Sequence, residues 1–250
     1  MRSVKVENLK NGLFVTGTDT GVGKTLVTAG LVRFARIQGR RCVAIKPVET
    51  GCPVRSGMLH PEDGVFLMEA SESDLSLDEC APFRFSLPAA PARAAAMEGS
   101  RIFLSDLVEH VQAVAESRDF VIAEGAGGLM VPIEDRLMMI DLVERLGCPV
   151  LLVARSRLGT INHTLLSVEA LRRRDLEIAG IILSGHDEES GPEERYTRRD
   201  VERLVGDTPV TVLPYLGHEI TTNPAKIAES MAEACGASLL RRWTGLETQH

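Results

Sequence analysis

The feature that most constrains this chain is a glycine-rich segment, FVTGTDTGVGKTLV at residues 14–27, between an apolar run and an amphipathic one. A strand, a glycine loop ending in Gly-Lys-Thr and a helix together form a phosphate-binding loop, whose backbone N–H groups face phosphate oxygens. Here five residues, where the usual loop has four, separate Gly17 from Gly23. The segment predicts a nucleotide site in which Lys24 meets the β- and γ-phosphates and the Thr25 hydroxyl faces magnesium.

Short apolar runs alternate with amphipathic stretches along the rest of the chain. The predicted strands are Leu13–Thr16, Cys42–Ile45, Phe120–Ala123, Pro149–Ala154, Ile178–Leu183 and Val210–Leu213. The predicted helices are Thr25–Gln38, Leu104–Glu116, Met139–Leu146, Thr160–Arg174, Arg195–Val205 and Ala225–Cys235. Near-continuous apolar strands separated by helices predict an α/β fold of the P-loop NTPase-like kind, a doubly wound, mainly parallel sheet with helices on both faces.

Domain organisation follows from the evenness of this pattern. No linker, repeat or low-complexity block divides residues 1–240, which we expect to form a single domain. The polar residues 241–250 are expected to form a frayed tail. Pro47–Glu62 has little periodicity and is expected to be a loop. The segment Ser86–Gly99 is rich in Pro and Ala, and its sequence does not determine whether it closes over a substrate.

Charge and cysteine content exclude several classes of protein. The net charge of −7 argues against a general nucleic-acid role, because no basic excess is available to neutralise phosphates. The five cysteines are scattered without metal-ligand spacing, and no signal peptide is evident. No apolar run reaches the ~18 residues of a membrane span. We therefore expect a reduced, cytoplasmic protein.

Charged residues stand where two further predicted strands end, which is where open parallel sheets bind ligands. Glu124 ends an apolar run and is followed by glycines at 125, 127 and 128, as expected of a carboxylate that holds magnesium beside a phosphate loop. Lys46 is either a snorkelling surface residue or a charge aimed at the ligand. Asp63 opens a helical stretch and, taken alone, favours a helix cap over a metal ligand.

Four separate blocks resemble the dethiobiotin synthase family of ATP-dependent ligases. They are GTDTGVGKT at 17–25, KPVETG at 46–51, EGAGG at 124–128 and LGTINH at 158–163. The likeness runs from Phe14 to about Leu216, and the family's phosphate loop carries the same extra residue. The resemblance implies a homodimeric, magnesium-dependent enzyme of biotin biosynthesis that acts on 7,8-diaminononanoate, CO2 and ATP. In the family, an amine captures CO2 as a carbamate that attacks the γ-phosphate, and the second amine closes the mixed anhydride into a cyclic urea.

The resemblance also implies roles for residues at matching positions. The catalytic residues would be Lys46, the family's active-site lysine, with Lys24 and Thr20. The magnesium ligands would be Thr25, Asp63 and Glu124, which for Asp63 replaces the helix-cap interpretation. The nucleotide-binding residues would be Gly21, Val22, Gly23, Lys24, Thr25, Leu26, Asp63, Glu124, Gly125, Ala126, Gly127, Ser184, Gly185, Pro214, Tyr215 and Leu216. The substrate-binding residues would be Thr50, Gly128, Thr160 and Asn162, the last two on a loop supplied from across the dimer.

Two positions depart from the family's pattern. Gly21 stands where some members have Glu, which removes one charge near the metal. Ser184 and Gly185 stand where an Asn-Asp pair is common, the Asn reading the adenine base. A serine offers one hydroxyl in place of the amide's paired donor and acceptor, so we expect discrimination among nucleotides to be loose.

Two other classes of protein are alternatives for a chain of this kind. ATPase switches of the ParA/MinD kind carry a second lysine five places before the loop lysine, where this chain has Asp19. They often end in a basic amphipathic helix, which Ala225–Cys235 is not. Cobyrinate-type amide ligases need a glutaminase domain with a nucleophilic cysteine, for which this chain shows no Cys/His pairing. The ATPase switch is kept as the alternative function.

Overall fold

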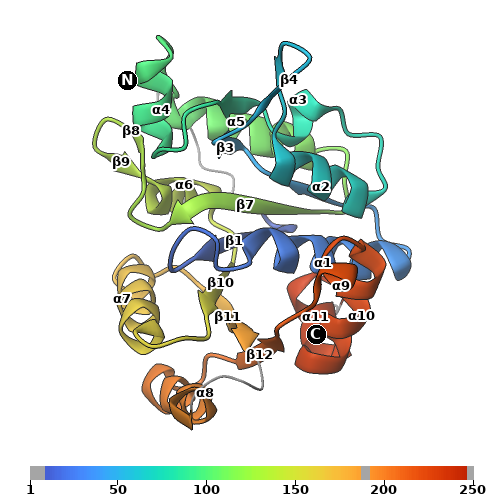
Figure 1. Ribbon diagram of the computed structural model, residues 1–250, viewed down its shortest axis with the longest axis vertical. Coiled ribbons are helices and arrows are strands. Elements are labelled where there is room, and N and C mark those ends of the chain that lie inside the picture. Colours follow the sequence, from blue (N-terminus) through green and yellow to red (C-terminus); the bar gives the residue numbers. More distant parts are fainter. Residues whose placement is uncertain (1–8, 187–191, 247–250) are drawn as a thin grey trace.

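The computed structural model describes residues 9–186 and 192–246, and a sheet of six parallel strands forms its centre (Figure 1). In spatial order the strands are β12 (Val210–Pro214), β11 (Ile178–His186), β10 (Val150–Arg155), β1 (Gly12–Gly17), β7 (Phe120–Gly128) and β2 (Cys42–Ile45). All six predicted strands are confirmed. The chain fills the sheet on one side of β1 and then on the other, and ligands of α/β sheets bind at such a switch point.

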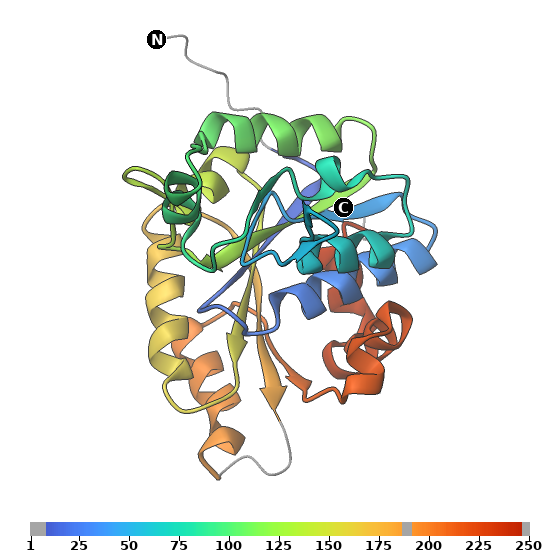
Figure 2. The ribbon, with the colours of Figure 1, turned by 45° about the horizontal axis from the view of Figure 1, so that its top comes forward.

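Helices cover both faces of this sheet, as the apolar strands predict (Figure 2). Those packed on one face are α1 (Lys24–Ile37), α2 (Glu62–Ser71), α10 (Pro224–Cys235) and α11 (Ala237–Trp243). Those packed on the other are α5 (Leu104–Ala115), α6 (Met139–Leu146), α7 (Thr160–Arg172) and α8 (Pro192–Val205). Side chains alternate along β1: Leu13 and Val15 join the first core, and Phe14 joins the second. Burial on both faces explains why β1 has no polar stripe.

The segment predicted to be a loop after β2 contains short strands, so that prediction is wrong in part. It holds β3 (Val48–Thr50) and the hairpin of β4 (Val54–Arg55) and β5 (Met58–Leu59). Strand β3 pairs in parallel with β6 (Phe83–Phe85). The remaining elements are α3 (Leu77–Cys80), α4 (Pro91–Met97), α9 (His218–Thr221), β8 (Pro132–Glu134) and β9 (Leu137–Met138). Strands of two or three residues are too short to show an alternating pattern in the sequence.

The C-terminal segment corrects the predicted boundary at residue 240. Helix α11 continues to Trp243, whose side chain is 1% exposed and donates from Nε1 to the Ala179 carbonyl at 3.0 Å. The prediction of a frayed tail is therefore wrong for residues 241–246, while residues 247–250, like residues 1–8 of the predicted domain, lie outside the described residues. Two arginines beside Trp243 make this segment look polar in the sequence, although the helix has an apolar face. Across residues 9–186 and 192–246, no helix combines the length and apolarity needed to span a membrane.

Candidate active site

The carboxyl ends of β1, β2 and β7 open onto one cavity of about 670 Å³. The sequence-predicted site residues that line it are Thr20, Gly21, Gly23, Lys24, Thr25, Leu26, Lys46, Thr50, Asp63, Glu124, Ala126 and Gly127. The segment Pro88–Pro91, which leads into α4, also lines it. The cavity thus joins the phosphate loop, the predicted metal ligands and the predicted active-site lysine.

The phosphate loop needs its glycines for its shape. Gly21 and Gly23 have φ angles of 68° and 100°, in the left-handed region that favours glycine. A Cβ on Gly23 would stand 2.7 Å from the Oγ of Ser184, at the end of β11, so no larger residue fits there without movement. Helix α1 begins directly afterwards at Lys24, which places its N-terminal N–H groups at the cavity.

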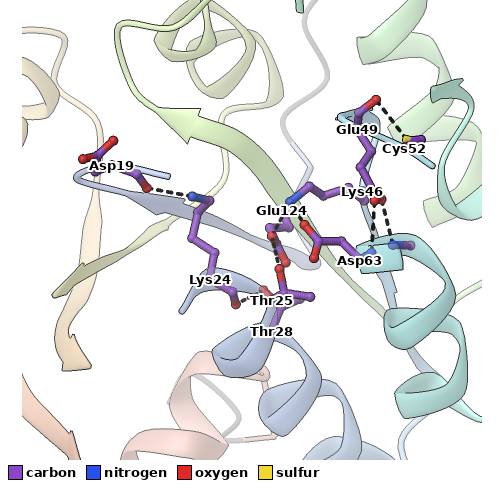
Figure 3. Close-up of polar contacts among 10 residues, drawn as sticks. Asp19, Lys24, Thr25, Thr28, Lys46, Glu49, Cys52, Asp63 and Glu124 are labelled. Carbon is purple, nitrogen blue, oxygen red and sulfur yellow. Dashed lines mark hydrogen bonds and ion pairs between the residues drawn. The ribbon is translucent and has the colours of Figure 1, made fainter. Parts of the chain in front are cut away.

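Lys24 is held within the phosphate loop. Its side chain is buried, and Nζ donates to the Asp19 carbonyl at 2.9 Å (Figure 3). Burial, followed by repulsion from Lys46, lowers the pKa of Lys24 to about 8. An anion in the cavity would stabilise the charged lysine, so this side chain favours a negatively charged ligand.

Four side chains from separate elements form one hydrogen-bonded network beside Lys24 (Figure 3). Thr25 Oγ1, at the start of α1, donates to Glu124 Oε1 at 2.8 Å. Lys46 follows β2 in the chain. Its Nζ lies 2.5 Å from the same Glu124 oxygen and 2.8 Å from Asp63 Oδ2 on α2. The two alternatives left open for Lys46 are therefore decided: its charge points inward, not into solvent.

Two members of the network, Glu124 and Lys46, are buried, and this burial governs its charges. Glu124 is 0% exposed and Lys46 is 4% exposed. Burial by itself would lower the pKa of Lys46, but the carboxylates of Glu124 and Asp63 outweigh it, and the pKa is raised. Burial would likewise raise the pKa of Asp63, but Lys46 outweighs it and the pKa is lowered. The opposite charges of Lys46 and Asp63 therefore stabilise each other's ionised form near neutral pH.

The donor set fits a magnesium ion. Thr25, Asp63 and Glu124 offer one hydroxyl and two carboxylates, and Mg²⁺ uses few protein ligands together with waters and substrate phosphates. Glu124 Oε2 is buried and has no hydrogen-bond partner, so one acceptor of the set is uncommitted. No group of three or more His, Cys, Asp or Glu side chains suited to a metal occurs among the described residues. The predicted set therefore depends on a hydroxyl and on the ligand's own oxygens.

Glu49 is a residue of this cavity that the sequence analysis did not single out. Its carboxylate is 7% exposed and accepts hydrogen bonds from the backbone N–H groups of Asp63 and Gly64, at 3.0 and 2.9 Å. Burial raises its pKa to about 6. The available signal was an acidic residue between apolar Val48 and the predicted substrate residue Thr50.

The predicted substrate residues do not all reach the main cavity. Thr50 lines it. Gly128 and Thr160 line two other cavities, of about 340 and 110 Å³, which share the segment Thr18–Thr20. Asn162 is exposed in the first turn of α7. Within one chain these three residues surround the outer side of the phosphate loop, and their contact with a substrate stays a prediction.

The predicted base-binding residues also lie apart from the main cavity. Ser184 is buried against Gly23, and Gly185 follows it with a φ of 79°. Beyond β12, Tyr215 is 67% exposed; Pro214 beside it is exposed, and Leu216 is buried. Two further residues predicted for the nucleotide site, Val22 and Gly125, are buried and do not line the main cavity. The part these residues play in nucleotide binding stays a prediction.

Comparison with known proteins finds relatives over most of the chain. A family model described as an AAA domain matches residues 11–224. ATP-dependent dethiobiotin synthetase BioD of Anaeromyxobacter sp. (strain K) is 42% identical over 228 residues, covering 91% of this chain and 98% of that protein. The proteins of the same name from Haloferax mediterranei and Bacillus subtilis are 40% and 36% identical and cover 91% and 83% of this chain, and 91% and 88% of their own lengths.

Solved structures with the same fold are more distant in sequence. A ParA family ATPase from Chlorobium tepidum has a TM-score of 0.54 at 16% identity, covering 95% of this chain and 98% of that chain. Cobyrinic acid a,c-diamide synthase from Mycobacterium smegmatis has a TM-score of 0.56 at 17% identity, covering 95% and 96%. These likenesses support the P-loop NTPase-like fold alone. The curated relatives, by identity and coverage, decide the family: the chain belongs to the ATP-dependent dethiobiotin synthetases.

Proposed function

We propose that this protein is an ATP-dependent dethiobiotin synthase. It would carboxylate 7,8-diaminononanoate with CO2 and close the ureido ring through a carbamic-phosphoric anhydride, releasing ADP and phosphate. The observation that carries the proposal is the buried lysine of the second strand end, Lys46, held by Glu124 and Asp63 in the cavity that the phosphate loop lines. A cavity built only to bind a nucleotide would not need this second, fully buried cation.

The charges of the cavity suit the reaction. A carbamate must approach a γ-phosphate, and two anions meet only where cations neutralise them. Lys24 and Lys46 are the cations of the cavity lining. A magnesium ion held by Thr25, Asp63 and Glu124 would supply further positive charge at the phosphates. Lys46 would orient the carbamate and stabilise the negative charge that develops as the phosphoryl group is transferred.

The diamine would lie on the side of the cavity away from the phosphate loop. Thr50 and the segment Pro88–Pro91 line that side, and an apolar segment of this kind suits the aliphatic chain of the substrate. Thr160 and Asn162 would contact the substrate from a second copy of the chain, because they lie on the outer side of the phosphate loop, away from the main cavity. The proposal therefore includes a homodimer with its active sites near the interface.

Base recognition would be weak in this protein. The serine at the end of β11 presents a single hydroxyl, and that side chain packs against the phosphate loop at Gly23. We expect ATP to be used with little preference over other triphosphates. Equal turnover with ATP and CTP would agree with this, and strict use of ATP would contradict it.

Phosphate release with magnesium and ATP tests the function directly, measured with and without 7,8-diaminononanoate and bicarbonate. We expect release to require the diamine and to be lost in Lys46→Ala. Lys226→Ala, an exposed lysine on α10, serves as the matched control and should release phosphate like the wild type. Release that ignores the diamine would contradict the ligase proposal and favour the ParA/MinD-like ATPase switch, whose support is otherwise a shared fold.

A further inference from the structure

The N-terminus of α2 is capped by a side chain from another element. The residue before the helix, Pro61, has no side-chain acceptor and makes no capping hydrogen bond. The backbone N–H groups of Asp63 and Gly64, in the first turn, instead donate to the two oxygens of Glu49 on β3 (Figure 3). First-turn N–H groups have no partner within a helix, so the carboxylate supplies bonds that a local cap usually provides.

This cap is fitted closely to its place. A Cβ on Gly64 would stand 2.8 Å from the Cβ of Ala81, so the first turn of α2 is pressed between the end of α3 and Glu49. The carboxylate is buried beside a second carboxylate, that of Asp63, and both burial and this neighbour disfavour its charge. If the cap served only stability, a buried carboxylate next to another carboxylate would not be needed, because a Ser or Asp at position 61 could cap the helix locally.

The consequence of the arrangement lies at Asp63. Only two residues separate Glu49 from Lys46 in the chain, so one short segment carries both the cap and the lysine. Glu49 accepts a hydrogen bond from the backbone N–H of Asp63, while Lys46 Nζ lies 2.8 Å from Oδ2 of its side chain. The Asp63 side chain is 42% exposed, and a side-chain hydrogen bond with Thr25 is its other polar contact. Its place relative to Glu124 therefore depends on these polar contacts, the cap among them.

We propose that Glu49 is a positioning residue for Asp63: it ties the first turn of α2 to β3 and so completes the oxygen set that would hold the divalent cation. The inference rests on the proposed function for the identity of the ligand, magnesium with a nucleotide. It goes beyond that function by assigning a role to Glu49, which would touch neither the metal nor the substrate.

Binding of Mn²⁺ in the presence of ADP tests the proposal without turnover, with free Mn²⁺ measured by electron paramagnetic resonance. In Glu49→Gln one oxygen is replaced by an NH2 group, so the side chain can accept from only one of the Asp63 and Gly64 N–H groups, and the first turn of α2 is held less firmly. We expect Mn²⁺ to bind about 10- to 100-fold more weakly, as for other residues that orient a metal ligand. Unchanged Mn²⁺ affinity would overturn the proposal.

Glu134→Gln is the matched control. Glu134 on β8 accepts the N–H of Leu104, the first residue of α5, at 2.8 Å, and so caps a helix from outside the lining of the cavity. Both variants should lower thermal stability, but only Glu49→Gln should weaken Mn²⁺ binding. Equal weakening in both variants would reduce Glu49 to a structural cap and reject the positioning role.

A double variant tests whether Glu49 acts through Asp63. In an Asp63→Asn background, Glu49→Gln should change the Mn²⁺ affinity by less than about twofold, because the group it positions is already lost. A full-sized effect in that background would contradict the inference. If Glu49→Gln does not fold, amide hydrogen exchange of the wild type decides: slow exchange at Asp63 and Gly64 supports the cap, and fast exchange overturns it.

These outcomes are separable from the fate of the proposed function. Mn²⁺ binding with ADP requires no diamine. A wild type that lacks diamine-dependent phosphate release would therefore refute the ligase activity, yet the comparison of Glu49→Gln with the wild type would still decide the positioning role.

Discussion

Replacing Lys46 by methionine should destabilise the protein strongly, because its ammonium group neutralises a carboxylate that has no access to water. The contact with Glu124 is fully buried, whereas the Asp63 carboxylate is 42% exposed and can be solvated in the variant. Removing one partner of a buried ion pair costs about 3–5 kcal/mol, and an exposed pair adds about 0–1 kcal/mol. We therefore expect the free energy of unfolding to fall by about 3–5 kcal/mol, mostly through Glu124.

The assay is urea denaturation followed by the fluorescence of Trp243, the chain's one tryptophan, which is 1% exposed and will change environment on unfolding. The double variant Lys46→Met with Glu124→Gln should recover to within about 2 kcal/mol of the wild type, because a neutral pair leaves no uncompensated buried charge. Lys226→Met, at an exposed position, should change stability by less than about 0.5 kcal/mol. A loss below about 1 kcal/mol for Lys46→Met, or a double variant no more stable than the single one, would refute this account of the network.

Three further outcomes follow from other parts of the structure. Gly23→Ala should weaken ADP binding by about tenfold or more in equilibrium dialysis, because its Cβ meets Ser184 and its φ is 100°; unchanged affinity would show that the loop can move. Truncation after residue 240 should lower the free energy of unfolding by about 3–5 kcal/mol, as for other losses of a buried tryptophan. If the truncated protein melts at the same temperature as the full-length protein, α11 is dispensable for stability. Burial raises the pKa of Cys42, Cys80 and Cys148 to about 12, so a thiol reagent at pH 8 should label none of the five buried cysteines until urea is added, and rapid labelling of the folded protein would contradict their burial.

The strands and long helices were predictable because their signals are local. A strand buried on both faces, such as Cys42–Ile45, is a continuous apolar run, and the predicted limits coincide with those of β2. The helix Met139–Leu146 likewise matches its prediction, since an amphipathic period and a following glycine mark both of its ends. The phosphate loop is also local, because its glycines and its lysine lie within a few residues of one another.

Elements whose stability comes from distant partners escaped prediction. Strand β3 exists because β6 pairs with it, and α11 packs because Trp243 reaches the Ala179 carbonyl. Neither contact produces a hydrophobic periodicity in the sequence of β3 or of α11. The two arginines next to Trp243 even suggest the opposite, a solvated tail.

The sequence by itself determined the chemistry of the site, because the phosphate loop, Lys46 and Glu124 stand at recognisable strand ends. The tertiary structure alone decided how those groups meet. Thr25 and Glu124 are 99 residues apart in the chain, yet they share a hydrogen bond at 2.8 Å. The orientation of Lys46, ambiguous from its pattern, follows from two carboxylates that other elements bring to it. The sequence specifies which residue types are present. The direction of a charged side chain depends on the free energy of burying its charge, and this free energy depends on the partners that the fold places within reach.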